Sequence, residues 1–292
     1  MLYLLLNTEK EITVGGLKRN YLDYIPINLE EDPRVLLVFH GSGSKASEFR
    51  VALGPTLERM ANEKKFILVY LSGYEGHFND CRKKAAYSAR KLNIDDKSLA
   101  KAIIHKLREE TGKPLTSIYA LGYSNGAQMT YRLALEEPDT YKGIIAVSAN
   151  LPHPENMDCQ IEDSKSGFPG VVIIQGTKDP INPTEGGDVS GVGVQSRGRV
   201  LSTSETAEWF AKKYSLKTDS PSPEDISLKR NLKAKKQVWK GENSGVMMVL
   251  LEGAGHTVPQ EFFPFSMALG PTYQDNTILE NAWNFLVGQT QK

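Results

Sequence analysis

The chain has only two cysteines, Cys81 and Cys159, among its 292 residues. Two cysteines cannot build a disulfide scaffold, and their separation fits no zinc-ligand spacing. One bridge between them and two free thiols are both compatible with the sequence. A chain of this length buries about three quarters of its unfolded surface, so a stable core needs no covalent cross-links.

An excess of charge of either sign is also absent, because 35 Lys and Arg residues balance 35 Asp and Glu residues. The balance gives no sign of a surface for nucleic acid or for an anionic membrane. The basic run at residues 233–236 lies in a polar stretch and is typical of a solvated loop or a strand edge.

Long apolar runs are missing as well. Residues 1–6 are apolar, but a secretory signal needs an apolar core of about 7–15 residues and a membrane span needs about 20. We therefore expect no membrane span and no signal peptide in this chain. That places the protein in the cytoplasm, unless a signal was removed from its start.

Apolar strand patterns alternate with helical patterns along the whole chain. Residues 11–14 and 21–27 flank Gly15 and Gly16 and predict an antiparallel hairpin. Continuous apolar runs then suit strands that are covered on both faces. These runs are residues 35–39, 66–70, 117–121, 144–147, 171–174 and 246–251, and the helical patterns are residues 98–110, 128–136, 202–214 and 276–287. The alternation predicts an α/β fold, with a mostly parallel central sheet and helices on both faces.

Two stretches interrupt this alternation. Residues 184–199 are rich in glycine, and residues 217–236 are polar. We expect both to be loops on one scaffold, since such loops at strand ends often line a functional site. Residues 1–292 are therefore expected to form a single domain.

The most informative segment is Gly122-Tyr123-Ser124-Asn125-Gly126, a G-x-S-x-G pattern between an apolar strand and a helix. A nucleophilic serine must lie on a very tight strand-to-helix turn for its hydroxyl to clear the sheet, and the glycines permit that close backbone approach. A glycine-rich turn with an incidental serine is the alternative, which the flanking strand and helix disfavour. The segment predicts Ser124 as a nucleophile.

Acyl transfer by such a serine needs two preorganised N–H donors for the oxyanion. One is expected at Asn125, directly after the nucleophile, and the other in the His-Gly loop that follows an early strand. Ser42 is the stronger candidate in that loop and Gly43 the second, while an ordinary strand-to-helix loop is the alternative. His40 is expected to brace the loop and not to act as the base.

The remaining partners should follow in the order acid, then histidine. Asp179 comes just past a core strand and before a proline, whereas Asp158 and Asp188 do not directly follow a strong strand. A turn-forming aspartate is the alternative for Asp179. His256 is the one histidine of five that follows Asp179, and its small neighbours leave the ring room to reach Ser124. The pattern predicts a Ser-His-Asp triad that works through an acyl-enzyme, with no cofactor and no metal.

These motifs resemble the polyhydroxybutyrate depolymerase and feruloyl esterase-type family of α/β-hydrolases, which includes acetyl xylan esterase-like members. The resemblance runs across nearly the whole chain and is carried by Asn79-Asp80-Cys81-Arg82, the G-x-S-x-G segment, Gly176-Thr177-Lys178-Asp179-Pro180 and Gly253-Ala254-Gly255-His256-Thr257. It implies a serine esterase with the same triad, acting on soluble esters such as hydroxyalkanoate oligomers or acetylated or feruloylated sugars. It also allows a periplasmic or secreted protein.

The chain departs from this family at two positions. Ser42 stands where the family often has cysteine, which should matter little because the backbone amide does the work. Val258 replaces a tryptophan beside the predicted base, which could alter the acyl or alcohol pocket.

Two other functions would use the same motifs. A serine peptidase or amidase could use the same triad, and a non-catalytic binding protein could retain the fold, although the loss of a triad residue would be its expected signature. Tyr74, His77, Asn79 and Phe263 are candidate substrate-binding residues. The alternative for the aromatic cluster around Phe263 is plain core packing. The expected partner is a small or oligomeric ester, and the oligomeric state is left open.

Overall fold

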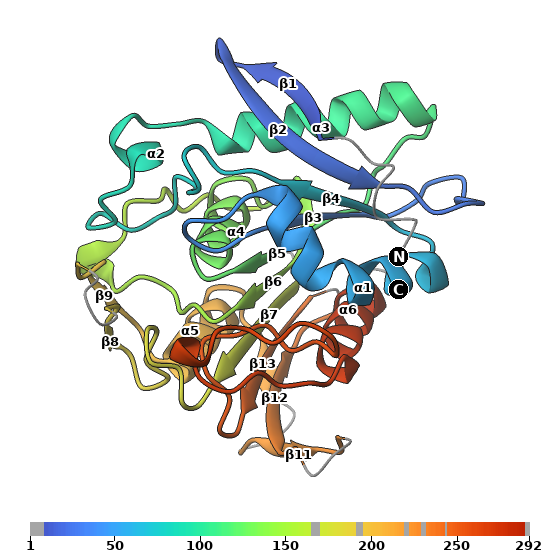
Figure 1. Ribbon diagram of the computed structural model, residues 1–292. Helices are drawn as coiled ribbons and strands as arrows, with labels where there is room; N and C mark the ends of the chain where they lie inside the picture. The colour runs from blue at the N-terminus through green and yellow to red at the C-terminus, as the bar shows by residue number, and fades with distance from the viewer. Residues whose placement is uncertain are drawn as a thin grey trace.

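The computed structural model describes residues 9–164, 170–190, 195–218, 222–228, 232–242 and 244–289 (Figure 1). The apolar residues 1–6, and parts of the stretches 184–199 and 217–236, lie outside the described residues. The strands are β1 Lys10–Val14, β2 Leu17–Tyr24, β3 Val35–Phe39, β4 Ile67–Leu71, β5 Ile118–Tyr123, β6 Tyr141–Val147, β7 Gly170–Gly176, β8 Gly187–Asp188, β9 Arg199–Val200, β10 Lys217–Thr218, β11 Glu224–Ile226, β12 Ala234–Lys240 and β13 Gly245–Leu251. The helices are α1 Ala46–Lys64, α2 Ser88–Lys91, α3 Asp96–Thr111, α4 Asn125–Glu136, α5 Thr203–Lys213 and α6 Thr277–Gln289.

The central strands form a parallel sheet in the order β4-β3-β5-β6-β7-β13. These six strands are the six continuous apolar runs of the sequence, and nearly all of their side chains are buried. Antiparallel strands extend the sheet at both edges, with β1 and β2 beside β4, and β12 beside β13. The prediction of a mostly parallel α/β sheet is confirmed.

The N-terminal hairpin has a two-residue turn, in which Gly15 and Gly16 have φ values of +57° and +79°. Two successive positive φ angles match the right-handed twist of the strands, and glycine adopts them without strain. The register pairs Val14 with Leu17, so β2 begins four residues before the predicted strand. The predicted hairpin is therefore present, with a second strand that begins four residues earlier and ends three residues earlier than the predicted 21–27.

Helices cover both faces of the sheet (Figure 1). Successive side chains of a strand point to opposite faces, and Leu37 and Leu36 of β3 accordingly belong to two separate cores. One core contains residues of α3, α4 and α5. The other contains residues of α1 and α6, which lie side by side in Figure 1. Among the described residues, none of the helices has the length and apolar character that crossing a bilayer requires.

Helix α1 and both predicted loops differ from the sequence prediction. Residues 184–199 were expected to be a loop, but β8 and β9 lie there and pair antiparallel. Helix α1 was not predicted, because Gly54 and Pro55 interrupt its pattern, and both residues disfavour the helix interior. Residues 217–236 were expected to be a loop, but β10, β11 and the start of β12 lie there and pair antiparallel. These edge strands are polar because one side faces solvent, so no apolar run marks them.

Candidate active site

Ser124 lies between the end of β5 and the start of α4, with φ +54° and ψ −113°. A side chain at Gly122 would place its Cβ 2.1 Å from the carbonyl oxygen of Gly126, and one at Gly126 would lie 2.2 Å from that of Phe39. Both contacts are with backbone, which cannot move aside cheaply. The two glycines of the motif are therefore required by the turn that exposes the serine.

A continuous chain of hydrogen bonds links Ser124, His256 and Asp179. The Ser124 hydroxyl lies 2.9 Å from His256 Nε2, and His256 Nδ1 lies 2.7 Å from Asp179 Oδ2. A carboxylate only accepts hydrogen bonds, so the ring carries its proton on Nδ1, and Nε2 is free to accept the hydroxyl proton. The structure thus brings together the three residues that the sequence proposed as the triad.

The Asp179 carboxylate is fully buried and accepts four hydrogen bonds. Oδ1 accepts from the amides of Ile181 and Asn182, both at 2.8 Å, and Oδ2 accepts from Gln175 Nε2 at 3.0 Å as well as from His256. These donors fix the carboxylate in one orientation. The turn-forming alternative for Asp179 is thus part of the same arrangement, because the turn supplies two of the donors.

Tyr123 holds His256 from the other side, a role that no sequence pattern indicates. Its hydroxyl donates to the backbone carbonyl of His256 at 2.7 Å, and its ring lies 5.2 Å from the imidazole. Burial, together with the charge of Asp179, raises the pKa of Tyr123, which keeps the hydroxyl protonated and able to donate. The variable position of G-x-S-x-G thus positions the histidine.

The predicted oxyanion donors lie in the expected loops. Ser42 lines the same cavity as Ser124, and within the described residues neither its amide nor that of Asn125 donates to another protein group. The Gly43 amide donates to Gly76 at 2.9 Å, so this second candidate is already occupied. The geometry favours Ser42 over Gly43.

The Asn125 side chain ties the turn to the segment that contains one cysteine. Its Nδ2 donates to Asp80 Oδ2 at 2.6 Å, and Asp80 forms a buried ion pair with Arg82 at 2.5 Å. Cys81, between them, forms a disulfide with Cys159, with a Cα–Cα distance of 4.9 Å. Of the two states that the sequence left open, the structure has the bridge, and it anchors the segment that contacts Asn125.

The cavity at Ser124 has a volume of about 370 Å³. Its lining is mostly apolar and aromatic, with two charged side chains at Glu48 and Arg197. The described residues that line it are Gly41, Ser42, Ser44, Glu48, Phe49, Ala52, Tyr123, Ser124, Ile181, Arg197, His256, Phe263, Phe265 and Leu269. Phe263 is therefore placed where a substrate-binding role was predicted, and its ring packs edge-on against Phe265 at 5.4 Å.

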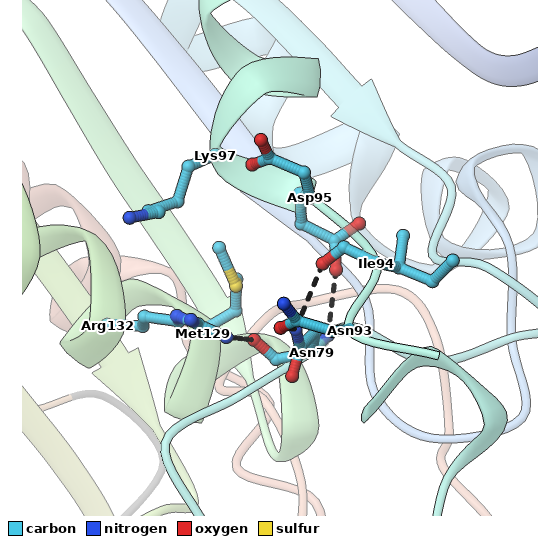
Figure 2. Close-up of a pocket in the computed structure, with 8 residues that line it drawn as sticks. Asn79, Asn93, Ile94, Asp95, Lys97, Met129 and Arg132 are labelled. Carbon is cyan, nitrogen blue, oxygen red and sulfur yellow. Dashed lines mark hydrogen bonds between the residues drawn. The ribbon is translucent and has the colours of Figure 1, made fainter. Parts of the chain in front are cut away.

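The other three candidate substrate-binding residues are not among the described residues that line this cavity. Tyr74 forms a β-bridge with His77. The His77 ring stacks on Tyr87 at a centroid distance of 4.0 Å, and Tyr87 in turn contacts Ser42, which lines the cavity. Asn79 lines a second, smaller cavity, where its side chain donates to Asn93 and to the carbonyl of Ile94 (Figure 2). The structure thus separates Asn79 from the candidate nucleophile.

Sequence relatives of the chain are named as esterases. The chain is 28% identical to the putative esterase NocK of Nocardia uniformis subsp. tsuyamanensis, over 96% of this chain and 83% of that protein. It is 26% identical to feruloyl esterase B of Thermothelomyces thermophilus, over 41% of this chain and 40% of that protein. No family model matches the chain.

Among solved structures, acetyl xylan esterase from Aspergillus awamori aligns with a TM-score of 0.57 at 15% identity, covering 85% of this chain and 94% of that one. The fold is that of an α/β-hydrolase. The poly(3-hydroxybutyrate) depolymerase LpqC from Bordetella parapertussis aligns with a TM-score of 0.50 at 16% identity, over 71% of this chain and 79% of that one. The resemblance to esterase-type α/β-hydrolases that the motifs indicated is confirmed.

His40 braces the loop that carries Ser42. Its Nδ1 donates to the Gly41 carbonyl at 2.7 Å, and its Nε2 accepts from the Gly73 amide at 2.9 Å. Burial lowers the pKa of His40 to about 4. The ring is therefore neutral in the folded protein at neutral pH, as both hydrogen bonds require.

The lowered pKa of His40 predicts that the folded protein loses stability in acid. Between about pH 6.5 and pH 4 the unfolded chain binds a proton at His40 that the folded chain does not bind, so stability falls as the pH falls. The expected contribution is about 3 kcal/mol of unfolding free energy lost by pH 4. Urea unfolding at pH 7 and pH 4 should show this loss in the wild type, and a correspondingly smaller loss in His40→Asn.

The matched control is His105→Gln. The side chain of His105 is 73% exposed, so this variant removes a histidine without removing a buried one and shows what the loss of a histidine alone does to the urea unfolding. If His40→Asn and the wild type lose the same stability between the two pH values, the neutral state assigned to His40 is wrong.

Proposed function

We propose that the chain is a serine carboxylic-ester hydrolase that acts on soluble esters through an acyl-enzyme. The observation that carries this proposal is the unbroken hydrogen-bond chain from Ser124 through His256 to Asp179. Its position at the end of a parallel strand, in a cavity with a mostly apolar lining, suits an ester with a small apolar part. The two sequence relatives described above, both named as esterases, favour ester over amide hydrolysis.

Each group has a defined task in the proposed reaction. His256 Nε2 accepts the Ser124 proton as Oγ attacks the ester carbonyl, and the amides of Asn125 and Ser42 stabilise the oxyanion. His256 then gives the proton to the departing alcohol, which leaves an acyl-enzyme. Water, activated by the same histidine, attacks the acyl-enzyme and releases the acid. Asp179 keeps the imidazole in the required tautomer and stabilises its charged form.

The substrate classes in question are hydroxyalkanoate oligomers and acetylated or feruloylated sugars. A cavity of about 370 Å³ lies at the small end of the range of about 300–1,000 Å³ that is usual for ligand pockets. We therefore expect short acyl groups to be preferred. The ring faces of Phe263 and Phe265 could contact a longer acyl chain or an aryl group.

A panel of p-nitrophenyl esters from acetate to octanoate, with methyl ferulate and the corresponding p-nitroanilides, tests this function. We expect hydrolysis of the short p-nitrophenyl esters, decreasing toward octanoate, with the anilides cleaved far more slowly. A fluorophosphonate should add covalently to Ser124, and peptide mass spectrometry would locate the adduct. Faster cleavage of the anilides would indicate an amidase. No turnover of any ester and no adduct would indicate a non-catalytic binding protein.

A further inference from the structure

Arg197 is a cation in the catalytic cavity that has no anionic partner among the described residues. It lines the cavity together with Ser124 and His256, and its side chain is half-buried. Within the described part of the chain, its guanidinium forms no ion pair and no hydrogen bond with a carboxylate. The neighbouring residues 191–194, Gly-Val-Gly-Val, carry no ionisable side chain. Partial burial of an unpaired guanidinium is unfavourable, which indicates a partner that is not part of the protein.

The charges nearest to Arg197 do not neutralise it. Asp80 and Arg82 are both buried and bind each other through two contacts, Nη2 to Oδ2 at 2.5 Å and Nε to Oδ1 at 3.1 Å. Asp80 also accepts from Asn125, so its carboxylate is fully used. The charges of Asp80 and Arg82 cancel each other. The three residues Asp80, Arg82 and Arg197 therefore carry one net positive charge, which lies on Arg197.

Glu48 is the other charged residue of the cavity lining, and it is compensated elsewhere. Its side chain is 57% exposed, lies 3.9 Å from Lys45 Nζ and accepts from the Ser44 hydroxyl at 3.2 Å. An exposed carboxylate in water attracts a cation only weakly. The electrostatic character that the cavity presents to a bound ligand is therefore set mainly by Arg197.

Aromatic stacking holds Arg197 close to the oxyanion loop. Its guanidinium carbon lies 5.3 Å from the centroid of the Tyr87 ring, which also contacts the Arg82 guanidinium at 5.9 Å, the stacked ring of His77 and the Ser42 hydroxyl at 3.0 Å. A guanidinium over an aromatic ring keeps its edge donors free for a planar anion. One ring thus separates these donors from the residue whose amide faces the reacting carbonyl.

We propose that Arg197 binds a carboxylate of the substrate, so that the preferred substrates are esters with an anionic group near the scissile bond. This proposal rests on the proposed ester hydrolysis and narrows its substrate class. A hydroxyalkanoate oligomer carries a free carboxylate at one end, whereas an acetylated neutral sugar carries none. Of the classes considered above, the proposal favours the first.

The test compares esters that differ only in this charge. One pair is p-nitrophenyl hydrogen succinate and its methyl-capped diester, with the carboxylate on the acyl side. The other is 4-acetoxybenzoate and its methyl ester, with the carboxylate on the alcohol side. We expect the wild type to have a higher kcat/KM for the anionic member of at least one pair. In Arg197→Gln the anionic-to-neutral ratio of kcat/KM should fall by about ten- to a hundredfold, the usual effect of losing a charge-assisted hydrogen bond.

Two further variants separate recognition from a structural role. Arg197→Lys keeps the charge and should recover part of the ratio that Arg197→Gln loses. Arg199→Gln removes an arginine two residues away whose side chain is 54% exposed and lies 3.8 Å from Glu155, and it should leave the ratio unchanged. If Arg197→Gln lowers the anionic-to-neutral ratio only for the succinate pair, the bound carboxylate lies on the acyl side of the ester. If it lowers the ratio only for the acetoxybenzoate pair, the carboxylate lies on the alcohol side.

The possible failures are distinguishable. Hydrolysis of none of the four esters by the wild type would overturn the proposed function together with this proposal. Hydrolysis of both members of each pair, with ratios that Arg197→Gln does not change, would overturn this proposal alone. An equal loss on anionic and neutral esters would mean that Arg197 only supports the loop around Tyr87.

Discussion

Ser124→Ala is expected to lower kcat on p-nitrophenyl esters by about a millionfold, the usual effect of losing a catalytic serine. The hydroxyl is the only atom group that the substitution removes, and its described hydrogen-bond partner is His256. Alanine keeps the Cβ and therefore the strained backbone at φ +54°. The fold should persist, with a thermal midpoint close to that of the wild type. End-point ester hydrolysis assays measure the loss of kcat, and thermal unfolding followed by circular dichroism measures the midpoint.

Ser42→Ala provides the contrast within the same cavity. It removes a hydroxyl bonded to Tyr87 but keeps the backbone amide that we assign to the oxyanion. The loss of kcat should stay well below the factor of about 10²–10³ that removal of an oxyanion donor causes. If Ser124→Ala keeps more than about one part in a thousand of the wild-type kcat, attack by Ser124 is not the main route of ester hydrolysis.

The sequence predicted the central sheet because its strands are buried on both faces. Val35–Phe39 and its parallel neighbours are continuous apolar runs, and such runs end where the strands reach polar loops. Helix α1 has no comparable signal, since its buried side includes Arg50 and Thr56 and its interior contains Pro55. The strands at the β12 edge are missing from the prediction for a similar reason. The side chains of β10 and β11 are mostly exposed, and in β12 only Ala234 and Trp239 are buried, so no apolar run marks these strands.

The three residues of the hydrogen-bond chain could be predicted because local chemistry restricts them. Gly122 and Gly126 are fixed by backbone contacts on either side of Ser124, and Asp179 and His256 follow the ends of core strands. Residues that reach the cavity from loops are not marked by a sequence motif or by the end of a core strand. Arg197 lies in a glycine-rich segment whose path no periodicity describes, and the loop around Asn79 turns toward Ile94 and α3 instead of the cavity.

Asp179→Asn should reduce kcat by about 10⁴-fold while the protein remains folded, as expected when a histidine is held in the wrong tautomer. The amides of Ile181 and Asn182 both donate to Oδ1, so in the variant the asparagine carbonyl oxygen must stay on that side. The asparagine NH₂ group then faces His256 Nδ1. It can only donate, so Nδ1 must give up its proton and Nε2 becomes the protonated nitrogen. A protonated Nε2 cannot accept the Ser124 hydroxyl proton.

Asp179→Asn should also lower the free energy of unfolding, because the carboxylate that it replaces is buried. In the wild type, Gln175 Nε2 donates to Asp179 Oδ2 at 3.0 Å. In the variant this donor faces the new NH₂ group, which is also a donor, and the two opposed donors should cost about 1–3 kcal/mol of unfolding free energy. Asp188→Asn is the matched control, because Asp188 is exposed and its side chain bonds only the Ser196 hydroxyl among the described residues. It should retain wild-type kcat and stability. A loss of less than about tenfold in Asp179→Asn would mean that another group orients His256, because the carboxylate would then have no part in selecting its tautomer.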